Sequence, residues 1–251
     1  ENGWITRDSL MNQVYYNNNK EDLNVRGTLE PLRDLRIELT ASKSQSFNYS
    51  TNFRFSPSNN SFENQSPITT GDFSMSYVLL RTAFAKEDRN SSSRLFRQFE
   101  ANREVISRRL GAINPNSNGT AGGYSDGYGK NSQDVVIASF MAAYTGKSAD
   151  KTSLNAFPKI PIPNWRITYN GLTKYDFFNK IFASFDVNHT YRSSYNINSF
   201  NSLARYQELN GFSSLKDVNG NFLPAYQFSQ ITLAEQFLPL IGIDFRLKNN
   251  L

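Results

Sequence analysis

Residues 33–56 read RDLRIELTASKSQSFNYSTNFRFS and alternate between polar and apolar side chains along most of their length. Every even-numbered residue from Arg36 to Ser56 is polar, whereas most odd-numbered residues from Leu35 to Phe55 are apolar. Successive side chains of a β-strand point to opposite faces, so the pattern predicts one strand with an apolar face and a polar face. At about 3.3 Å per residue it would be roughly 70 Å long, whereas most strands of globular proteins have about 5–6 residues.

The composition combines a low mean hydropathy of −0.55 with 20 Phe and 13 Tyr among 251 residues. This combination is typical of sheets in which apolar and polar residues alternate and aromatic residues mark a boundary. No apolar run approaches the roughly 18 residues of a membrane helix, but strands that cross a membrane show only alternation. The chain has no cysteine, which excludes disulfides, thiolate metal sites and cysteine nucleophiles.

The same alternation recurs elsewhere and predicts an antiparallel arrangement of long strands. A turn at Pro31 and Leu32 would join a short strand to the strand that begins at Arg33. Two polar segments, 57–71 and 198–226, are expected to be loops, the second containing the hairpin dipeptide Asn219-Gly220. The further alternating segments are 22–30, 71–84, 165–169, 179–198 and 229–248.

The pattern changes within residues 86–162, which we expect to form a helical and loop insertion between strands. Residues 93–110 have Leu95, Phe99, Ile106 and Leu110 at helical spacing, with serines in front and Gly111 behind. Residues 133–145 fit a helix or a strand, and the four-residue spacing of their large apolar side chains favours the helix. Three prolines within residues 158–163 predict an extended segment.

These elements predict an all-β fold with helical insertions, in which residues 1–251 form an arc of a very large antiparallel transmembrane β-barrel. The walls of such barrels face lipid on one side and water on the other. A soluble sandwich or solenoid would explain the alternation, but not strands of about 20 residues. The smallest barrels have about eight strands, so the five or six strands expected here would be part of something larger.

Few segments resemble a catalytic or ligand-binding motif. The glycine-rich segment 122–132 lacks the spacing of a phosphate-binding loop. Residues 217–222 have Phe222 at the position where a calcium loop requires glycine, and they are expected to form a turn. His189 is the sole histidine and lies in an apolar register. Asp186, Glu235 and Asp244 show no pairing that suits acid–base work. We therefore expect no catalytic, cofactor-binding or metal-binding residues, and no enzyme.

Two charged features need a specific interpretation. Glu235 lies in the apolar register of its strand, and Pro239 follows it. We infer that a lipid-facing band begins only after Pro239 and that the preceding segment projects beyond the membrane or meets a partner. The helix from Arg94 to Arg109 carries five arginines and two glutamates, which predicts either a solvated face or contact with lipopolysaccharide phosphates or a partner. The net charge of +5 is spread along the chain, so no nucleic-acid partner is expected.

The segments FRQFEANREVISRRLG (96–111), QDVVIASFMAAYTGK (133–147) and FPKIPIPNWRITYNGL (157–172), in this order, resemble the SprA (Sov) family. These are very large outer-membrane proteins that form the translocon of the type nine secretion system. The resemblance covers most of the chain and is weakest in residues 1–30 and 112–132. It implies that the chain is one portion of a much longer protein, whose barrel is wide enough to pass folded cargo to the cell surface.

The resemblance also implies the partners: secreted cargo proteins, a smaller outer-membrane barrel of the PorV type, plug and periplasmic accessory proteins, and outer-membrane lipid. It implies no catalytic residues. Two other classes stay open. A TonB-dependent nutrient transporter also has an aromatic, Asn-rich barrel but imports small ligands past a plug domain. A secreted adhesin or binding module of sandwich form is the third class.

Overall fold

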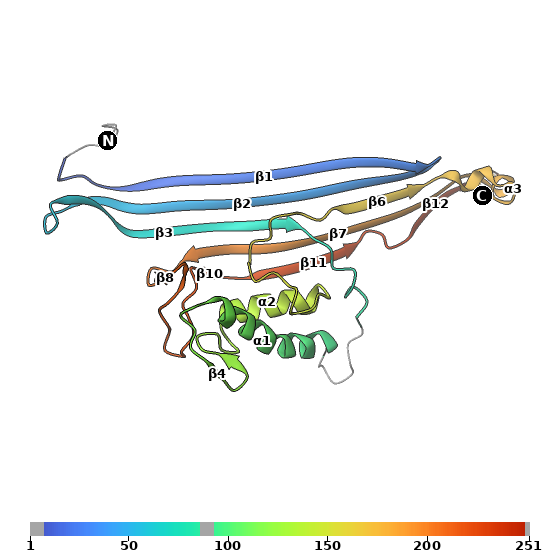
Figure 1. The fold of residues 1–251 in the computed structure, drawn as a ribbon. Coiled ribbons are helices and arrows are strands. Elements are labelled where there is room, and N and C mark those ends of the chain that lie inside the picture. The colour runs from blue at the N-terminus through green and yellow to red at the C-terminus, as the bar shows by residue number, and fades with distance from the viewer. Residues whose placement is uncertain (1–7, 86–92, 249–251) are drawn as a thin grey trace.

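The computed structural model describes residues 8–85 and 93–248 (Figure 1). This part of the chain is mainly β, with one large antiparallel sheet and few helices. The sheet contains β1 (Asn12–Leu32), β2 (Leu35–Ser56), β3 (Ser61–Ser76), β6 (Asn164–Tyr169), β7 (Phe182–Ser202), β10 (Tyr226–Phe228), β11 (Ile231–Phe237) and β12 (Gly242–Leu247). The helices are α1 (Arg94–Ile113), α2 (Gln133–Tyr144), α3 (Asp176–Ile181) and a 3-10 turn at Gly171–Lys174, and two short hairpins pair β4 (Thr120–Ala121) with β5 (Tyr124–Ser125) and β8 (Glu208–Leu209) with β9 (Phe212–Ser213).

The strand predicted from residue 33 is present as β2, whose 22 residues pair with β1 from Leu35 to Arg54. A two-residue turn joins the two strands, and Asp34 takes the positive φ (70°) that this turn requires. β1 is much longer than expected. Its Asn-rich first half shows no alternation in hydropathy, so the sequence does not reveal it as a strand, and its extended conformation results from the pairing with β2. The hairpin therefore provides two paired antiparallel strands of 21 and 22 residues.

Between β2 and β7, one strand position is shared by two separate segments. β3 pairs with residues 43–56 of β2 and β6 pairs with residues 35–40, both antiparallel, so β3 and β6 run in the same direction in one line. On the other side, β3 pairs with residues 194–201 of β7 and β6 with residues 187–191. The chain thus leaves the sheet after Ser76, forms the inserted segment 77–163, and resumes the same strand position at Asn164.

The gap between β3 and β6 is closed by side chains. Ser42 N–H donates to the Ser76 hydroxyl (3.0 Å), and Ser193 N–H donates to the Asn164 side-chain oxygen (2.8 Å). Tyr77 N–H donates to the Ser193 carbonyl (3.0 Å) at the point where the chain leaves the sheet. A buried backbone donor without a partner costs about 1–3 kcal/mol, so these polar side chains allow a strand to be interrupted within the sheet.

The position beyond β7 is also shared, here by β12, β11 and β10, which pair in turn with residues 182–188, 191–197 and 200–202. The predicted strand 229–248 is therefore broken near Pro239, as its proline suggests. Thr190 bridges this break, because its N–H donates to the Pro239 carbonyl (3.0 Å) and its carbonyl accepts from Leu238 N–H (2.9 Å). Within the described residues, β1 and this interrupted strand are the two edges of the sheet.

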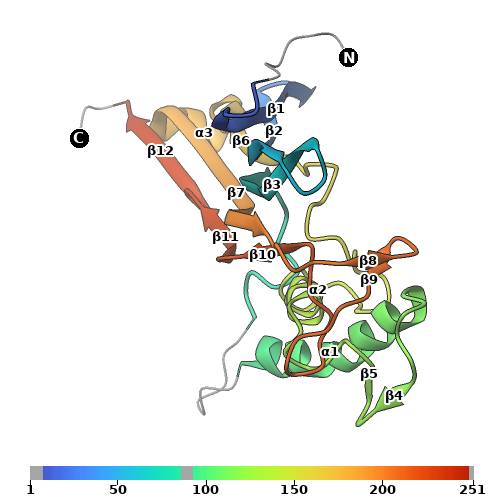
Figure 2. The ribbon, with the colours of Figure 1, turned by 90° about the vertical axis from the view of Figure 1, so that its left-hand side faces the viewer.

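Residues 93–157, here called the helical module, cover one part of the sheet. α1 packs on α2 through Ile106 and Leu110, which contact Val135 and small residues of α2 such as Ala138 and Ala142. The small side chains let the two helices approach closely. α2 in turn packs Met141, Ile137 and Phe140 on the sheet, and Figures 1 and 2 show both helices on the same side of it.

The sheet core beneath the module is aromatic and lies on the odd-numbered, apolar face. Its buried residues are Phe73, Met75, Tyr77, Leu79, Met141, Tyr195, Ile197 and Phe200. An irregularity in the pairing of β3 with β7 between Gly71 and Phe73 brings Phe200 onto this face. Gly71 is required there, because a Cβ would clash with the Ser46 carbonyl and the Phe200 ring.

Several boundaries differ from those expected. Residues 61–71 belong to β3 rather than to a loop, because their backbone pairs with β2. Their side chains, rich in Asn, Ser and Thr, do not alternate in hydropathy, so the sequence does not reveal this strand. β3 ends at Ser76, so residues 77–84 are not strand, and the insertion begins earlier than residue 86, which itself lies outside the described residues. β7 reaches Ser202, and the expected loop 198–226 is shortened to 203–225 and contains β8 and β9.

Both expected helices are confirmed, with one change. Of residues 133–145, α2 contains Gln133–Tyr144, so this segment is helical rather than strand. Ser93 caps α1 by accepting from Phe96 N–H (3.0 Å), as predicted, but the helix continues past Gly111 to Ile113 and ends at Asn114. Gly111 serves packing instead, since a Cβ would clash with the Ser125 side chain. α3 was not predicted, because its six residues are too few to show helical periodicity.

We expect Ile106→Ala to lower the free energy of unfolding of the helical module by about 2–5 kcal/mol, because Ile106 is fully buried between α1 and α2. Native-state hydrogen exchange of the α1 and α2 amides measures this change. Ile113→Ala is the matched control on the same helix, since Ile113 is half exposed and its truncation should change stability by less than about 1 kcal/mol. Equal protection in the two variants would contradict the packing described here.

Candidate membrane-facing surface

The part of the apolar face that surrounds β6 is not covered by the helical module. Because directly paired residues of antiparallel strands lie on the same face, the register places ten apolar side chains of five strands side by side. We call this surface the apolar band: Val25, Leu29, Ile37, Leu39, Trp165, Ile167, Phe185, Val187, Ile243 and Phe245.

The apolar band is exposed to the surroundings of the chain. Val25 and Leu29 are each 53% exposed, and Ile243 and Phe245 are 53% and 59% exposed, although all four are large apolar side chains. Figure 1 shows α1 and α2 beneath β3, β10 and β11, whereas no helix lies beneath β6 and β12. A contiguous apolar surface of this kind marks contact with a membrane or with another protein.

The height of the band fits a membrane. On β7 the band lies between the aromatic residues Phe182 and Tyr191, and the ten residues from one to the other span about 33 Å at about 3.3 Å per residue. If the strand tilts by about 40°, as in membrane barrels, these residues cover about 25 Å along the membrane normal. This is the height of the apolar belt of outer-membrane barrels, about 25 Å.

Aromatic side chains lie at both ends of the band. At the end near the module, Trp165 stacks on Tyr191 (ring centroids 4.3 Å apart), and Phe237 packs on Tyr191 (5.3 Å). At the α3 end, Phe178 packs on Phe185 (5.1 Å) and Tyr175 is 62% exposed. Trp and Tyr are enriched where a membrane meets water, because their rings are apolar and their N–H or O–H groups are polar.

Tyr191 and Glu235 form a polar contact at the module end of the band. The fully buried Tyr191 hydroxyl donates to Glu235 Oε1 (2.6 Å) and accepts from Leu79 N–H (2.7 Å). Glu235 lies opposite Ser193 on the apolar face, and the hydrogen bond from Tyr191 gives its carboxylate a partner in this register. On its far side, Leu240 and Ile241 follow Pro239 and are exposed. The contact lies before Pro239, after which the sequence predicts that a lipid-facing band begins.

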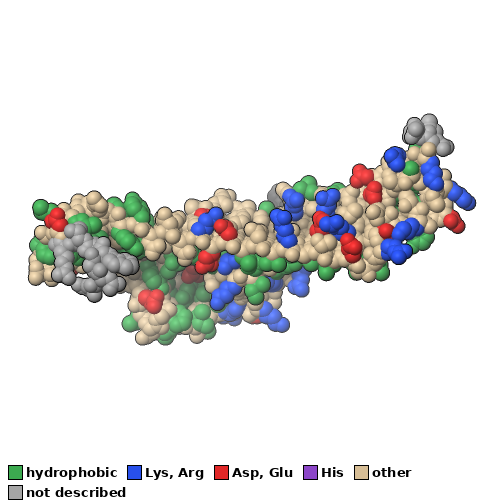
Figure 3. Space-filling model, turned by 90° about the horizontal axis from the view of Figure 1, so that it is seen from above, with side chains coloured by type: hydrophobic (Ala, Val, Ile, Leu, Met, Phe, Trp, Pro, Cys, Tyr) green, Lys and Arg blue, Asp and Glu red, His purple; other side chains and the backbone are tan. Residues whose placement is uncertain are grey.

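The opposite face of the same strands is polar. It carries the ion pair between Arg36 and Glu38 (2.8 Å) and the side chains of Thr40, Asn188 and Asp244. Seen from above, Lys and Arg side chains gather over the middle and the α3 end of the molecule (Figure 3). Lys248 donates to Asn179 Oδ1 (2.8 Å) at the α3 end. The strands around β6 are therefore apolar on one side and charged on the other.

The structure also places the acidic residues that the sequence singled out. Asp186 and Asp244 are directly opposite each other on the polar face, a pairing that the sequence did not reveal because β7 and β12 are distant along the chain. Asn188 donates to Asp244 Oδ2 (2.8 Å). Glu235 lies on the other face, so the three carboxylates do not converge. Among residues 8–85 and 93–248, no group of three or more His, Asp or Glu side chains could hold a metal ion.

His189 lies on the apolar face, as expected, beside Trp165 and Phe237 (ring centroids 6.4 and 6.1 Å away). Its Nδ1 is 2.6 Å from the Leu240 carbonyl. Residues 217–222 form a turn in which Asp217 Oδ1 accepts from Asn219 and Asn221 N–H (both 2.8 Å). These contacts give His189 and Asp217 structural partners.

The segment 122–132 is held against the rest of the chain by specific contacts. Asp126 pairs with Lys216 (2.7 Å), and this hydrogen-bonded ammonium lowers the pKa of the Asp126 carboxyl below its usual value. Gly129 N–H donates to Asn221 Oδ1 (2.9 Å). The glycine-rich segment thus joins the helical module to the connection 203–225 and does not form a phosphate-binding loop.

The arginines of α1 fall into two groups. Arg103 and Arg108 pair with Glu100 and Glu104 of the same helix (3.1 and 4.0 Å), and Arg109 donates to the Ala149 and Thr152 carbonyls. Arg94 and Arg97, in the first turn, are exposed. The first turn therefore presents two exposed arginines to an external partner, and Arg108 is exposed as well.

Comparison of the chain with protein-family models and with curated proteins gives no match. None of the helices in the described part of the chain is long and apolar enough to cross a membrane.

The two faces of β12 give a direct test. The chain has no cysteine, so Ile243→Cys and Asp244→Cys would each carry a single thiol, on the apolar and the polar face respectively. In native membranes we expect a membrane-impermeant maleimide to label Asp244→Cys at least about tenfold faster, because lipid covers position 243 and water reaches position 244. Labelling after denaturation controls for the reactivity of each thiol. Equal rates in native membranes would contradict a lipid-facing band.

Proposed function

We propose that this chain forms part of the wall of a very large outer-membrane β-barrel that conducts folded cargo proteins to the cell surface. The observation that carries the proposal is the apolar band of about 25 Å, bounded by aromatic residues, on strands whose opposite face is polar. Lipid would cover the band, and the polar face would line a water-filled lumen. On this proposal the wall is a passive conduit and catalyses no reaction.

The two open edges support a wall that continues on each side. β1 is 21 residues long and pairs on one side only, and the interrupted strand of β10, β11 and β12 is the other edge of the described sheet. Long unpaired edges promote uncontrolled association, and closure of a barrel removes them. The eight strands occupy five positions side by side, too few for a closed membrane barrel, so further strands would pair with both edges.

The connections suggest an orientation. At the α3 end, a two-residue turn joins β1 to β2 and residues 170–181 join β6 to β7, whereas the longer connection 203–225 lies at the other end and the inserted segment 77–163 leaves the sheet between the two ends. Outer-membrane barrels have short periplasmic turns and long extracellular loops, so the helical module would lie at the cell surface. There it would cover the part of the wall that projects beyond the membrane, and Arg94 and Arg97 would face lipopolysaccharide phosphates or a partner.

The cargo and partners come from the resemblance to the SprA (Sov) family. Secreted proteins would pass through the lumen, a PorV-type barrel would collect them, and plug and periplasmic accessory proteins would close the pore. The TonB-dependent nutrient transporter is the second candidate, because its barrel wall would have the same two faces.

A bulky group on the polar face separates these functions. In Thr40→Cys the thiol would lie on the polar face of β2, opposite Asn164. We expect a 5-kDa polyethylene glycol maleimide at this position to reduce secretion of a reporter cargo by at least about fivefold, because it occupies the lumen of a conducting barrel.

Asp150→Cys is the matched control, since Asp150 is exposed on the helical module, outside the sheet. The same reagent at that position should leave secretion unchanged. Loss of import of one small nutrient with intact protein export would favour the transporter. Unchanged export and import would contradict a lumenal position for this face.

A further inference from the structure

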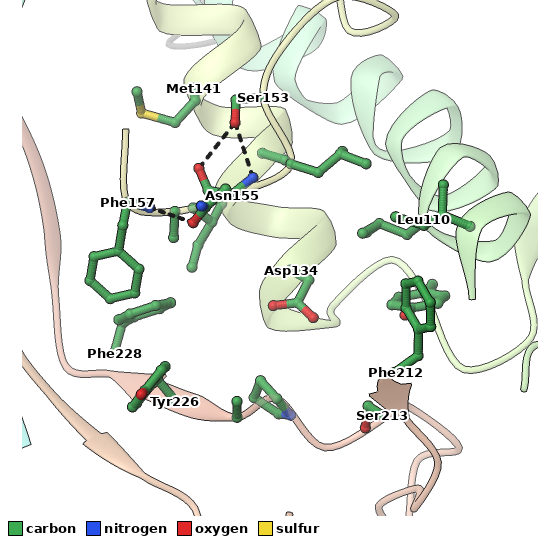
Figure 4. A pocket seen from close by; sticks show the side chains of 18 of the residues that line it. Leu110, Asp134, Met141, Ser153, Asn155, Phe157, Phe212, Ser213, Tyr226 and Phe228 are labelled. Carbon is green, nitrogen blue, oxygen red and sulfur yellow. Dashed lines mark hydrogen bonds between the residues drawn. The ribbon is translucent and has the colours of Figure 1, made fainter. Parts of the chain in front are cut away.

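A pocket of about 410 Å³ lies between the helical module and the connection 203–225, away from the apolar band (Figure 4). The end of α1 and one side of α2 form one wall, residues 153–157 form a second, and residues 206–213 and 224–228 close it. Pockets of about 300–1,000 Å³ accommodate small organic ligands. The volume is therefore sufficient for a specific ligand.

The pocket is held open by hydrogen bonds between its walls. The Gln133 side chain donates to the Tyr226 carbonyl (2.7 Å) and accepts from Phe228 N–H (3.1 Å), which fixes β10 against the start of α2. Asn114 donates to the Tyr128 hydroxyl (2.9 Å) and to the Ser213 carbonyl (3.0 Å), which fixes β9 against the end of α1. The pocket is thus a built feature of the fold.

Asp134, in the first turn of α2, points into this pocket. No described residue donates a hydrogen bond to its carboxylate or forms an ion pair with it, and no Lys or Arg lines the pocket. Burial raises the pKa of Asp134 to about 6. The N-terminus of α2 favours a negative charge there, but it does not offset the loss of water around the carboxylate.

The rest of the lining is mostly apolar and rich in aromatic rings. Phe157 packs on Phe228 (ring centroids 5.6 Å) on one side of Asp134, and Phe212 lies on the other side (Figure 4). The aromatic residues of the lining are Tyr128, Phe157, Tyr206, Phe212, Tyr226 and Phe228. Aromatic faces attract cations as well as apolar groups. An unpaired carboxylate among aromatic rings is complementary to a cation on an apolar body.

We propose that this pocket binds an organic cation, an amine or guanidinium carried on an aromatic or apolar group, with Asp134 as its counter-ion. The ligand is either a free amine or a basic side chain next to an aromatic residue in a polypeptide. The cation neutralises the one unpaired charge of the pocket, and its apolar part covers the aromatic walls. The proposal does not depend on the function of the sheet, because the pocket lies outside the apolar band.

Calorimetric titration of the whole chain tests whether the charge of Asp134 contributes to ligand binding. Phenethylamine is the probe, and 2-phenylethanol is its neutral counterpart of similar size. We expect Asp134→Asn to weaken phenethylamine binding by at least about tenfold and to leave binding of 2-phenylethanol unchanged. Asp150→Asn, which removes a carboxylate of the module outside the pocket, should change neither.

Further arms test the pocket and the source of the ligand. Phe212→Ala removes an aromatic wall without changing α2 and should weaken phenethylamine binding several-fold. The wild-type affinity should fall from about pH 8 to about pH 5, because Asp134 becomes protonated while the amine stays charged. A Phe-Arg-Phe peptide and the same peptide with citrulline in place of arginine identify the source of the ligand. If the arginine peptide binds more tightly than both its citrulline counterpart and phenethylamine, the ligand is a polypeptide. If phenethylamine binds more tightly than the arginine peptide, the ligand is a free amine.

Two results would overturn the proposal. One is equal affinity of phenethylamine for the wild type and for Asp134→Asn. The other is absence of saturable binding of both phenethylamine and the arginine peptide up to about 10 mM. Circular dichroism of each variant confirms that the chain is folded, and Phe212→Ala keeps the test valid if Asp134→Asn fails to fold.

Discussion

The architecture depends on one constraint: the backbone hydrogen bonds of β2 and β7 must be satisfied where β3 stops and β6 begins. Ser76 and Asn164 meet this constraint with side-chain oxygens that accept from Ser42 and Ser193 N–H. Because these bonds close the gap, the chain can leave the middle of the sheet without exposing unpaired backbone groups. The inserted segment 77–163 therefore emerges from the face of the sheet and not from one of its ends, and this position lets the helical module cover the adjoining apolar face.

The apolar face consequently has two environments along the same strands. Near β3 it is buried by protein, with Phe73, Met75 and Tyr195 packed against α2 and Phe157. Around β6 it is exposed and bounded by aromatic residues, and the contact between Tyr191 and Glu235 lies between the two parts. One alternating sequence pattern thus provides both a protein core and a surface suited to lipid. The part of the apolar face that the helical module covers becomes core, and the uncovered part stays exposed.

The sequence predicted what depends on local pattern. The alternation of β2, the helical spacing of α1 and the break at Pro239 were all visible, because each is caused by neighbouring residues. The first half of β1 and residues 61–71 of β3 were missed, since their Asn- and Ser-rich strands are specified by pairing and not by hydropathy. The opposition of Asp186 and Asp244 and the isolation of Asp134 arise from segments far apart in the chain, so no spacing rule could reveal them.

The shared strand position of β3 and β6 has a consequence for the kinetics of folding. Completing this position brings Ser76 and Asn164 together across the inserted segment, and the entropy of closing so long a loop opposes it. The helices and their local contacts form faster than pairings between distant strands. Once α1 and α2 have docked, the two ends of the inserted segment are held near each other, and β6 can add to β2 almost as a continuation of β3. Early folding of the module would thus act as an internal template that sets the rate at which the sheet is completed.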